Sequence, residues 1–390
     1  MFRRLPQTLP ADPSFPADLA QLGFFVNDND QIRQIKNPAQ KFQYKMNANE
    51  RVNQAYKFAS NLATRKIILD RLHALGLETV RLPLGAGPTD KHVPILVSKD
   101  IGSKDRVVVF LGERQMEPGV LSWRVIGDTG IRHGSMVDFV DAALNGPTAT
   151  AEQKSPGIVI ANPCQLLWFR GGARAVSDGE WMDMPRPNGV SEALRQDKEV
   201  NRVEHNRDYS QHVQYIFSHV LRELVSKDAK IDVIGLEYAA GAALEYLAGH
   251  WSDWAGRITG ICLANAQYKM EDLVQGGAPP EFVAFVSKRC RAYSVSPSPL
   301  EAPVSGRERL GCNCYASGEH DYHENVVVKA WRSMLDWFNI LYANPGHEEV
   351  EFIYIEEGED EQGKMVWSKE EAEAAIAEQV NGDDEGNGQR

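Results

Sequence analysis

The stretch Ile231–Leu247, IDVIGLEYAAGAALEYL, decides the fold of this chain. A short β-branched run ends at Gly235, one polar residue follows, and small residues then lead into a helical pattern. This layout predicts a strand, a sharp turn and a helix, with the turn residue displayed at the top of a parallel sheet. Enzymes with such a corner carry a serine in the pattern Gly-x-Ser-x-Gly, but here Glu237 holds the serine position and Ala239 that of the last glycine. The sequence therefore predicts the corner without its serine chemistry.

Strand-like and helix-like segments alternate on both sides of this stretch. Because such alternation packs helices on both faces of a mostly parallel sheet, we expect an α/β protein with a three-layer α/β/α hydrolase-like fold. Two short apolar runs, Leu22–Val26 and Gln31–Ile35, predict an N-terminal β-hairpin. The further strands are expected at 78–82, 93–98, 106–111, 157–161, 231–235, 257–263 and 311–316, and the main helices at 49–75, 209–225 and 325–341.

Residues 162–205 are rich in glycine, proline and charge, so we expect a long irregular insertion above the sheet. Within it, the basic residues Arg170 and Arg174 follow the aromatic residues Trp168 and Phe169. RNA-binding segments also combine basic and aromatic side chains in this way. A solvated loop over buried aromatics is the commoner explanation. We expect this loop to meet a protein partner rather than RNA.

Candidate site residues stand at the carboxyl ends of three predicted strands, where function collects in an open parallel sheet. Glu237 follows one strand, Asn265 follows the next, and His323 lies in the loop after the last core strand. In a serine hydrolase these positions hold nucleophile, acid and base in that chain order. Glu237 cannot attack as an alkoxide, and Asn265 cannot stabilise an imidazolium by charge. We therefore predict a degenerate triad and assign no catalytic residue.

Two hypotheses for Glu237 stay open. Its carboxylate could attack a substrate directly, forming an ester intermediate that His323 helps to hydrolyse. Alternatively, it is a polar cap on the helix that follows, where a carboxylate is favourable by about 0.3–1 kcal/mol. A tight turn with a non-glycine at positive φ would cost about 1–3 kcal/mol, so a relaxed turn is expected as the alternative.

A pocket is expected around this turn, and it would serve a small-ligand-binding pseudoenzyme if chemistry is lost. Gly112 and Glu113 lie where an oxyanion loop would, but they lack the glycine run that presents backbone N–H groups. The spacing His320-x-x-His323, with Asp321 between, raises a metal hypothesis. No third ligand cluster accompanies it, so we expect no metal and no cofactor. The pocket candidates are Gly112, Glu113, Gly235, Leu236, Tyr238 and His320.

Composition excludes several classes of protein. With 43% hydrophobic and 25% charged residues the chain reads as a soluble globular protein, and no window approaches the roughly 20 apolar residues of a membrane span. The N-terminus lacks the apolar run of a secretory signal, and five scattered cysteines do not describe a disulfide framework. We expect an intracellular protein with no membrane contact.

The net charge of −12 is concentrated at one end of the chain. Residues 348–390 hold 15 acidic and 3 basic residues, so the rest of the chain is neutral. A neutral body lacks the basic footprint of a nucleic-acid-binding protein, which argues against direct nucleic-acid binding. We predict one α/β-hydrolase-like domain over residues 1–356 and a flexible acidic tail over residues 357–390.

Six stretches carry a resemblance to a known family. They are Leu22–Asn27, Arg106–Gly112, Gly157–Pro163, the segment around Glu237, Leu263–Asn265, and Ser317-Gly318 leading to His323-Glu324. Together they span most of residues 15–345. In order and spacing they resemble the domain family named after Argonaute-binding protein 2, which also forms the C-terminal part of some class II histone deacetylases.

The resemblance implies an α/β-hydrolase-like fold and a role in RNA-silencing or heterochromatin complexes through protein contacts. Family members with a plausible triad have serine at the position of Glu237, an acid at that of Asn265 and histidine at that of His323. This sequence departs at the first two positions. We therefore expect a non-catalytic scaffold in the nucleus and/or cytoplasm, with Argonaute or histone-deacetylase complex components as partners and self-association left open. The alternative is a hydrolase that uses Glu237 and His323.

Overall fold

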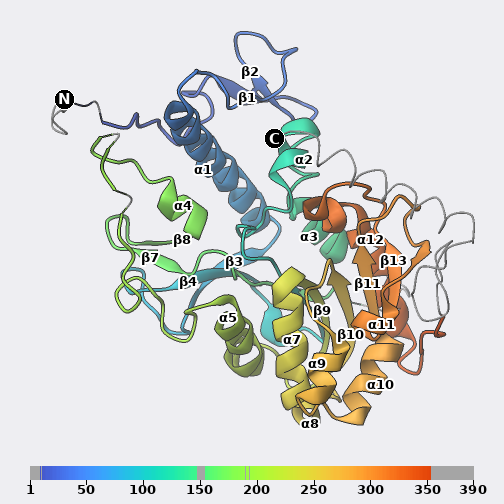
Figure 1. The fold of residues 1–390 in the computed structure, drawn as a ribbon. Coiled ribbons are helices and arrows are strands. Elements are labelled where there is room, and N and C mark those ends of the chain that lie inside the picture. Colours follow the sequence, from blue (N-terminus) through green and yellow to red (C-terminus); the bar gives the residue numbers. More distant parts are fainter. Residues whose placement is uncertain (1–8, 10, 147–153, 189, 193, 353–390) are drawn as a thin grey trace, which may run out of the picture.

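A nine-stranded sheet runs through the middle of the computed structural model, which describes residues 9, 11–146, 154–188, 190–192 and 194–352 (Figure 1). Most of its strands are buried on both faces, as near-continuous apolar runs such as RVVVFL require. The strands are β3 (Leu77–Leu82), β4 (Val93–Ser98), β5 (Arg106–Leu111), β6 (Gly157–Ile160), β9 (Lys230–Leu236), β10 (Ile258–Ala264), β11 (Cys290–Ser294), β12 (Pro303–Val304) and β13 (Asn313–Ala316).

The strand order is β12-β13-β11-β10-β9-β5-β6-β4-β3. All neighbouring pairs from β13 to β6 are parallel, while β12 at one edge and β4 and β3 at the other are antiparallel. The predicted mostly parallel sheet is confirmed. Because β5, β9 and β10 are adjacent and parallel, the loops that follow them all emerge at one edge of the sheet.

Helices cover both faces of the sheet and complete the predicted three layers (Figure 1). Cores of buried apolar side chains lie on the two faces. One face carries α1 (Glu50–Ala74), α2 (Trp123–Asp128), α3 (Val137–Asn145) and α12 (Val326–Ala343). The other carries α5 (Tyr209–Tyr215), a π-helical turn (Ile216–Val220), α6 (Leu221–Glu223), α7 (Glu237–Gly249), α8 (Trp251–Trp254), α9 (Met270–Gln275), α10 (Pro280–Arg289) and α11 (Arg307–Leu310).

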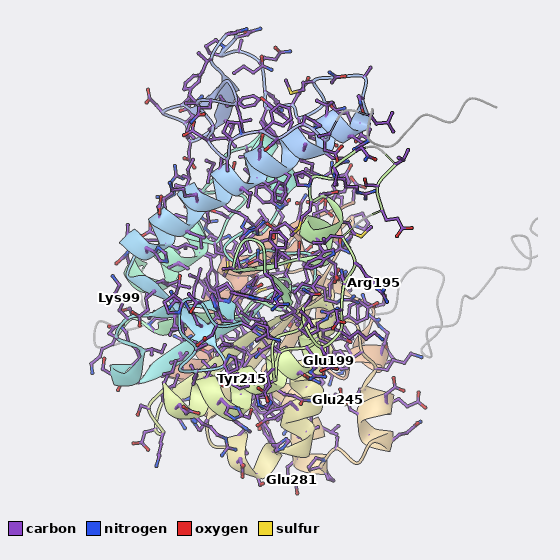
Figure 2. All side chains as sticks on the ribbon, turned by 90° about the vertical axis from the view of Figure 1, so that its left-hand side faces the viewer. Lys99, Arg195, Glu199, Tyr215, Glu245 and Glu281 are labelled. Atoms are coloured by element: carbon purple, nitrogen blue, oxygen red, sulfur yellow. The ribbon has the colours of Figure 1, made fainter. Side chains whose placement is uncertain are left out.

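Close packing of α12 on β10 depends on a glycine. A Cβ atom at Gly260 would lie 2.3 Å from Cδ1 of Leu341, which is far inside van der Waals contact. The space around the sheet is filled by side chains, while charged residues such as Lys99 and Glu281 lie at the periphery (Figure 2). Among the helices that the structure describes, none has the length and apolar character needed to cross a bilayer.

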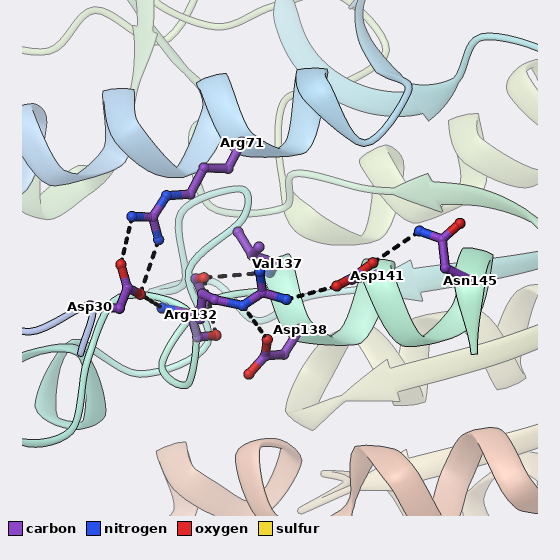
Figure 3. Close-up of polar contacts among 8 residues, drawn as sticks. Asp30, Arg71, Arg132, Val137, Asp138, Asp141 and Asn145 are labelled. Atoms are coloured by element: carbon purple, nitrogen blue, oxygen red, sulfur yellow. Dashed lines mark hydrogen bonds and ion pairs between the residues drawn. The ribbon is translucent and has the colours of Figure 1, made fainter. Parts of the chain in front are cut away.

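The predicted N-terminal hairpin is formed by β1 (Phe24–Val26) and β2 (Ile32–Gln34). Asp30 in its turn accepts hydrogen bonds from both terminal nitrogens of Arg71 on α1, at 3.0 and 2.5 Å, and from the backbone N–H of Arg132 at 2.6 Å (Figure 3). The Arg132 guanidinium in turn binds Asp138 and Asp141 of α3, each at 2.7 Å. This polar network fixes the hairpin to the helical layer.

Two segments differ from the sequence-based expectation. The insertion 162–205 is not irregular throughout, because it contains the antiparallel pair β7 (Leu167–Phe169) and β8 (Arg174–Val176), followed by α4 (Asp178–Met182). Three-residue strands are too short for a periodic signal. The helix expected at 209–225 is interrupted by the π-helical turn. The predicted tail, 357–390, lies outside the described residues.

Candidate functional site

Strand register brings the site residues together. Leu111 of β5 and Leu263 of β10 are both paired with Gly235 of β9. Two residues beyond these aligned positions, where the backbone has left the sheet, lie Glu113 after β5, Asn265 after β10 and Glu237 after β9. Parallel strands in register carry such equivalent positions side by side, so the pairing itself assembles three polar side chains at one edge.

The turn at Glu237 keeps the strained shape of a nucleophile elbow. Glu237 has φ of +44°, although it has a Cβ, and it begins α7 directly after β9. A Cβ on Gly235 would lie 2.8 Å from Cα of Ala240, so only glycine permits this close approach of strand and helix. The relaxed turn considered from the sequence is therefore not formed. Residues held in this region typically cost about 1–3 kcal/mol.

Asn265 faces Glu237 from the end of β10. Its backbone also has positive φ, +47°, which asparagine tolerates better than most residues. Its side-chain Nδ2 donates a hydrogen bond to Oε1 of Glu237 at 3.3 Å. The backbone N–H of Gln267 donates to the carbonyl of Glu237 at 3.1 Å, which ties the two turns together. The amide thus orients the carboxylate that occupies the nucleophile position.

Glu113 is the second carboxyl group of the site. Its pKa is raised to about 8, mainly by burial and additionally by a hydrogen bond from Glu237 and the negative charges of Glu237 and Glu324. Two carboxylates in contact cannot both ionise cheaply, so one proton is retained between them at neutral pH. The carboxyl group of Glu113 is consequently protonated at neutral pH.

His323 approaches the same pair from the loop after β13. It begins a short 3-10 turn (His323–Asn325), and its Nε2 lies 3.6 Å from Oε1 of Glu237. Its Nδ1 lies 3.8 Å from Oε2 of Glu324, whose other oxygen accepts from Nε of Arg124 at 3.2 Å. Both ion-pair partners that His323 has in the described chain are carboxylates. An imidazole so placed has no hydroxyl to deprotonate.

The loop before His323 is held by Glu319, a residue that the sequence did not single out. Its Oε1 accepts the backbone N–H groups of His320, Asp321 and Tyr322 at 3.1–3.3 Å. Burial alone would raise the pKa of Glu319, but these N–H donors outweigh it and lower the pKa. Anchoring by Glu319, rather than by His323, therefore fixes this loop.

A cavity of about 590 Å³ opens above the cluster. Beneath the cluster the structure leaves only about 10 Å³, so the carboxyl pair forms the floor of the cavity. One wall is the polar side of α1, a second is the loop after β5, and a third is the start of α4. The lining residues are Lys57, Phe58, Asn61, Leu62, Arg65, Glu113, Arg114, Gln115, Glu117, Trp123, Ser177, Asp178, Gly179, Glu180, Asp183, Glu237, Tyr238 and His323.

The sequence-based candidates divide into three groups. The structure brings Asn265 and His323 into contact with Glu237, each through Oε1 of that residue. Glu113 and Tyr238 line the large cavity, whereas Leu236 lines only the small cavity of about 10 Å³ beside the cluster. The remaining candidates, Gly112, Gly235 and His320, are not among the residues that line the cavity, and Gly235 serves the packing of the turn.

The walls contributed by α1 and α4 were missed from the sequence. The polar face of α1 reads as a solvated surface, and α4 lies in a segment expected to be irregular. One local signal was available: Ser177 and Glu180 form a capping box at the start of α4, with the spacing Ser-x-x-Glu. Nothing local reveals which sheet-top loop such a helix would face.

Within the described residues, His320, Asp321 and His323 do not form a group of converging ligand atoms, so the metal hypothesis based on their spacing gains no support. Instead, Glu113, Glu237 and His323 each offer a ligand atom, and these atoms all lie within 4.8 Å of one another. Chemically, the site can hold a proton between two carboxyl groups, and it presents oxygen and nitrogen atoms to the cavity.

Comparison with known proteins places the chain in a family. The family model of the Arb2 domain matches residues 15–300. No curated protein sequence matches the chain. Among solved structures, the histone deacetylase Clr3 is similar with a TM-score of 0.41 and 11% identity, over 72% of this chain and 38% of that one. The chain therefore spans well under half the length of Clr3.

Two mycobacterial proteins are similar at the same low level. Esterase LipW from Mycobacterium marinum has a TM-score of 0.35 and 11% identity, over 77% of this chain and 92% of that one. MPT51 (FbpC1) from Mycobacterium tuberculosis has a TM-score of 0.29 and 10% identity, over 74% and 92%. The family match covers most of the chain, including the elbow and both neighbouring strand ends. This α/β-hydrolase-like chain belongs to the Arb2 domain family.

Proposed function

We propose that this Arb2 domain is a non-catalytic scaffold that binds protein partners in RNA-silencing or heterochromatin complexes, in the nucleus and/or cytoplasm. The observation that carries the proposal is the occupant of the elbow. Glu237 occupies the nucleophile position of the elbow and accepts a hydrogen bond from Asn265, which occupies the position of the triad acid. The residues at these two triad positions therefore bind each other. Acyl transfer by a serine triad needs a hydroxyl, an imidazole and a carboxylate in series.

Support for a binding role comes from what the fold retains. The strained elbow and the cavity are both present, although the serine that acts as nucleophile in hydrolases is replaced by Glu237. Tyr238, beside Glu237, lines the cavity and is 46% exposed. Exposed aromatic residues are enriched at protein interfaces, where they contribute large contact area. Folds of this type are often reused without their chemistry.

The partners expected for this scaffold are components of Argonaute or histone-deacetylase complexes. Affinity purification of the tagged chain, followed by identification of co-purifying proteins, tests this expectation. Tyr238→Ser is expected to reduce recovery of the partner, whereas Val274→Ser, at a similarly exposed position on α9, should leave it unchanged. Reproducible absence of silencing and deacetylase components would count against the proposal.

A second candidate, a hydrolase with a carboxylate nucleophile, is favoured by one observation. Glu113, whose pKa is raised to about 8, is hydrogen-bonded to Glu237, and adjoining carboxyl groups in unlike environments supply acid and base in many active sites. Glu237 would form the ester, protonated Glu113 would donate a proton to the leaving group, and His323 would activate water.

A panel of activated esters and epoxides separates the two functions. The scaffold predicts no turnover above that of Glu237→Gln. Turnover by the native chain that disappears in Glu237→Gln, while Glu245→Gln on the exposed face of α7 keeps it, would establish the hydrolase instead.

A further inference from the structure

The cluster Glu113, Glu237 and His323 has the composition of a metal-binding site. It offers two carboxylate oxygens and one imidazole nitrogen from the loops after β5, β9 and β13. Zinc and related divalent ions are commonly held by three protein ligands of these types, with a fourth position left open. The cavity of about 590 Å³ lies on the open side, so a fourth ligand would have access.

Among the described residues, no lysine or arginine forms an ion pair with the carboxyl groups of the cluster. Within the described residues, the ion-pair partner of Glu237 is His323, and Glu113 has none. Three basic residues line the same cavity, but each is engaged elsewhere. Arg65 lies 3.7 Å from Glu180, Arg114 lies over the ring of Tyr209, and Lys57 lies over the ring of Tyr44. The positive charge that two adjoining carboxylates require must therefore come from a proton or a bound cation.

The surroundings also orient the candidate ligands. Asn265 holds Oε1 of Glu237 by a hydrogen bond of 3.3 Å. Glu324 lies 3.8 Å from Nδ1 of His323, on the side away from Glu237, and Arg124 binds Glu324 in turn. A carboxylate on the Nδ1 side of a histidine favours metal coordination through the other ring nitrogen. Here that nitrogen, Nε2, is the one that faces Glu237.

We propose that Glu113, Glu237 and His323 bind one divalent metal ion of the zinc class at the floor of the cavity. Bond lengths near 2.1 Å would bring the ligand atoms to about 3.4 Å from one another. The side chain of His323, which is 57% exposed, has the freedom to close that distance. The proposal does not rest on the scaffold function, because a metal could be held with or without partner proteins.

The experiment is titration calorimetry of the full chain with Zn²⁺ after removal of metals by a chelator. The native chain is expected to bind one equivalent tightly, and Mg²⁺, which is poorly matched to imidazole, is expected to bind far more weakly. Glu237→Gln and His323→Gln should each weaken Zn²⁺ binding by at least tenfold. His320→Gln removes a neighbouring exposed imidazole outside the cluster and should leave the affinity unchanged.

A second measurement guards against variants that fold poorly. Zn²⁺ should raise the melting temperature of the native chain and of His320→Gln in a concentration-dependent way, because an ion that binds only the folded state stabilises it. Glu324→Gln, which leaves all three ligands in place, should weaken binding by about 10- to 100-fold. Failure of the native chain to bind an equivalent of Zn²⁺, or equal affinity in the native chain and His323→Gln, would overturn the proposal.

Discussion

Nδ2 of Asn265 donates a hydrogen bond to Oε1 of Glu237 over 3.3 Å, and both residues have positive φ. In a serine hydrolase of this fold, the same two turns display the nucleophile and present an acid. Here an amide and a carboxylate occupy them and bind each other. The backbone of the elbow has thus kept its shape while its side chains have changed chemical type.

Glu237→Gly is expected to be more stable than Glu237→Ala by about 1 kcal/mol. Both variants remove the carboxylate, but only glycine relieves the strain of positive φ, which amounts to about 1–3 kcal/mol before glycine's own entropy cost. Urea unfolding measures the difference. At Glu245, in the middle of the same helix, the order should reverse, because glycine in a helix interior costs about 1 kcal/mol relative to alanine. A Glu237→Ala variant as stable as Glu237→Gly would contradict a strained elbow.

Glu113 predicts a stability that falls as pH rises. Its pKa is about 8 in the folded chain and near 4.5 when unfolded, so between these values the folded state holds a proton that the unfolded state has released. Stability is therefore lost as pH increases through this window, by at most about 1.4 kcal/mol per pH unit. In chelator, Glu113→Gln should flatten the dependence between pH 5 and 8 and stabilise the chain most at high pH. Glu117→Gln, in the same loop, should follow the native profile.

His212 predicts the opposite dependence at acidic pH. Complete burial lowers its pKa to about 3, and its ring is held neutral with Nε2 accepting from the N–H of Asn162 at 2.9 Å. Its Nδ1 is 2.7 Å from Oδ1 of Asn206, so Nδ1 carries the hydrogen. As pH falls from 6.5 toward 3, His212 is protonated in the unfolded state but stays neutral in the folded state, so the free energy of unfolding decreases.

The check is a comparison of pH profiles. His212→Gln should be destabilised at pH 7 by about 1–3 kcal/mol, through a loss of buried hydrogen bonds. Its further loss of stability between pH 6.5 and 4 should be smaller than that of the native chain. His219→Gln, on the exposed face of the helical segment, should keep the native slope. Equal slopes in the native chain and His212→Gln would contradict a neutral, buried ring.

Arg71→Met should loosen the N-terminal hairpin. The guanidinium grips both oxygens of Asp30, and its loss leaves a partly buried carboxylate without its main partner (Figure 3). We expect a destabilisation of about 1.5–3 kcal/mol, and faster hydrogen exchange in β1 and β2. The matched control is Arg222→Met, which removes an exposed pair with Asp253 and should cost less than about 1 kcal/mol. Equal costs for the two variants would show that the hairpin contact contributes little.

Much of the fold was predictable because its signals are local. The apolar run of β5 and the alternation of strands and helices require only neighbouring residues to be read. The same is true of the elbow, where Gly235 and the small residues of α7 predict a tight turn. The short strands β7 and β8 were missed, because three residues give no period and their pairing depends on a turn rather than on a pattern.

The sequence by itself determined the class of fold and the presence of Glu237, Asn265 and His323 at strand ends, because strand ends and chemical types can both be read along the chain. Only the tertiary structure decided that Glu113 lies beside Glu237, and that α1 and α4 line the cavity above them. These relationships join residues from distant parts of the chain; Glu113 and Glu237, for example, are 124 positions apart. They depend on strand register and helix placement, which arise from the packing of the whole core rather than from any local pattern.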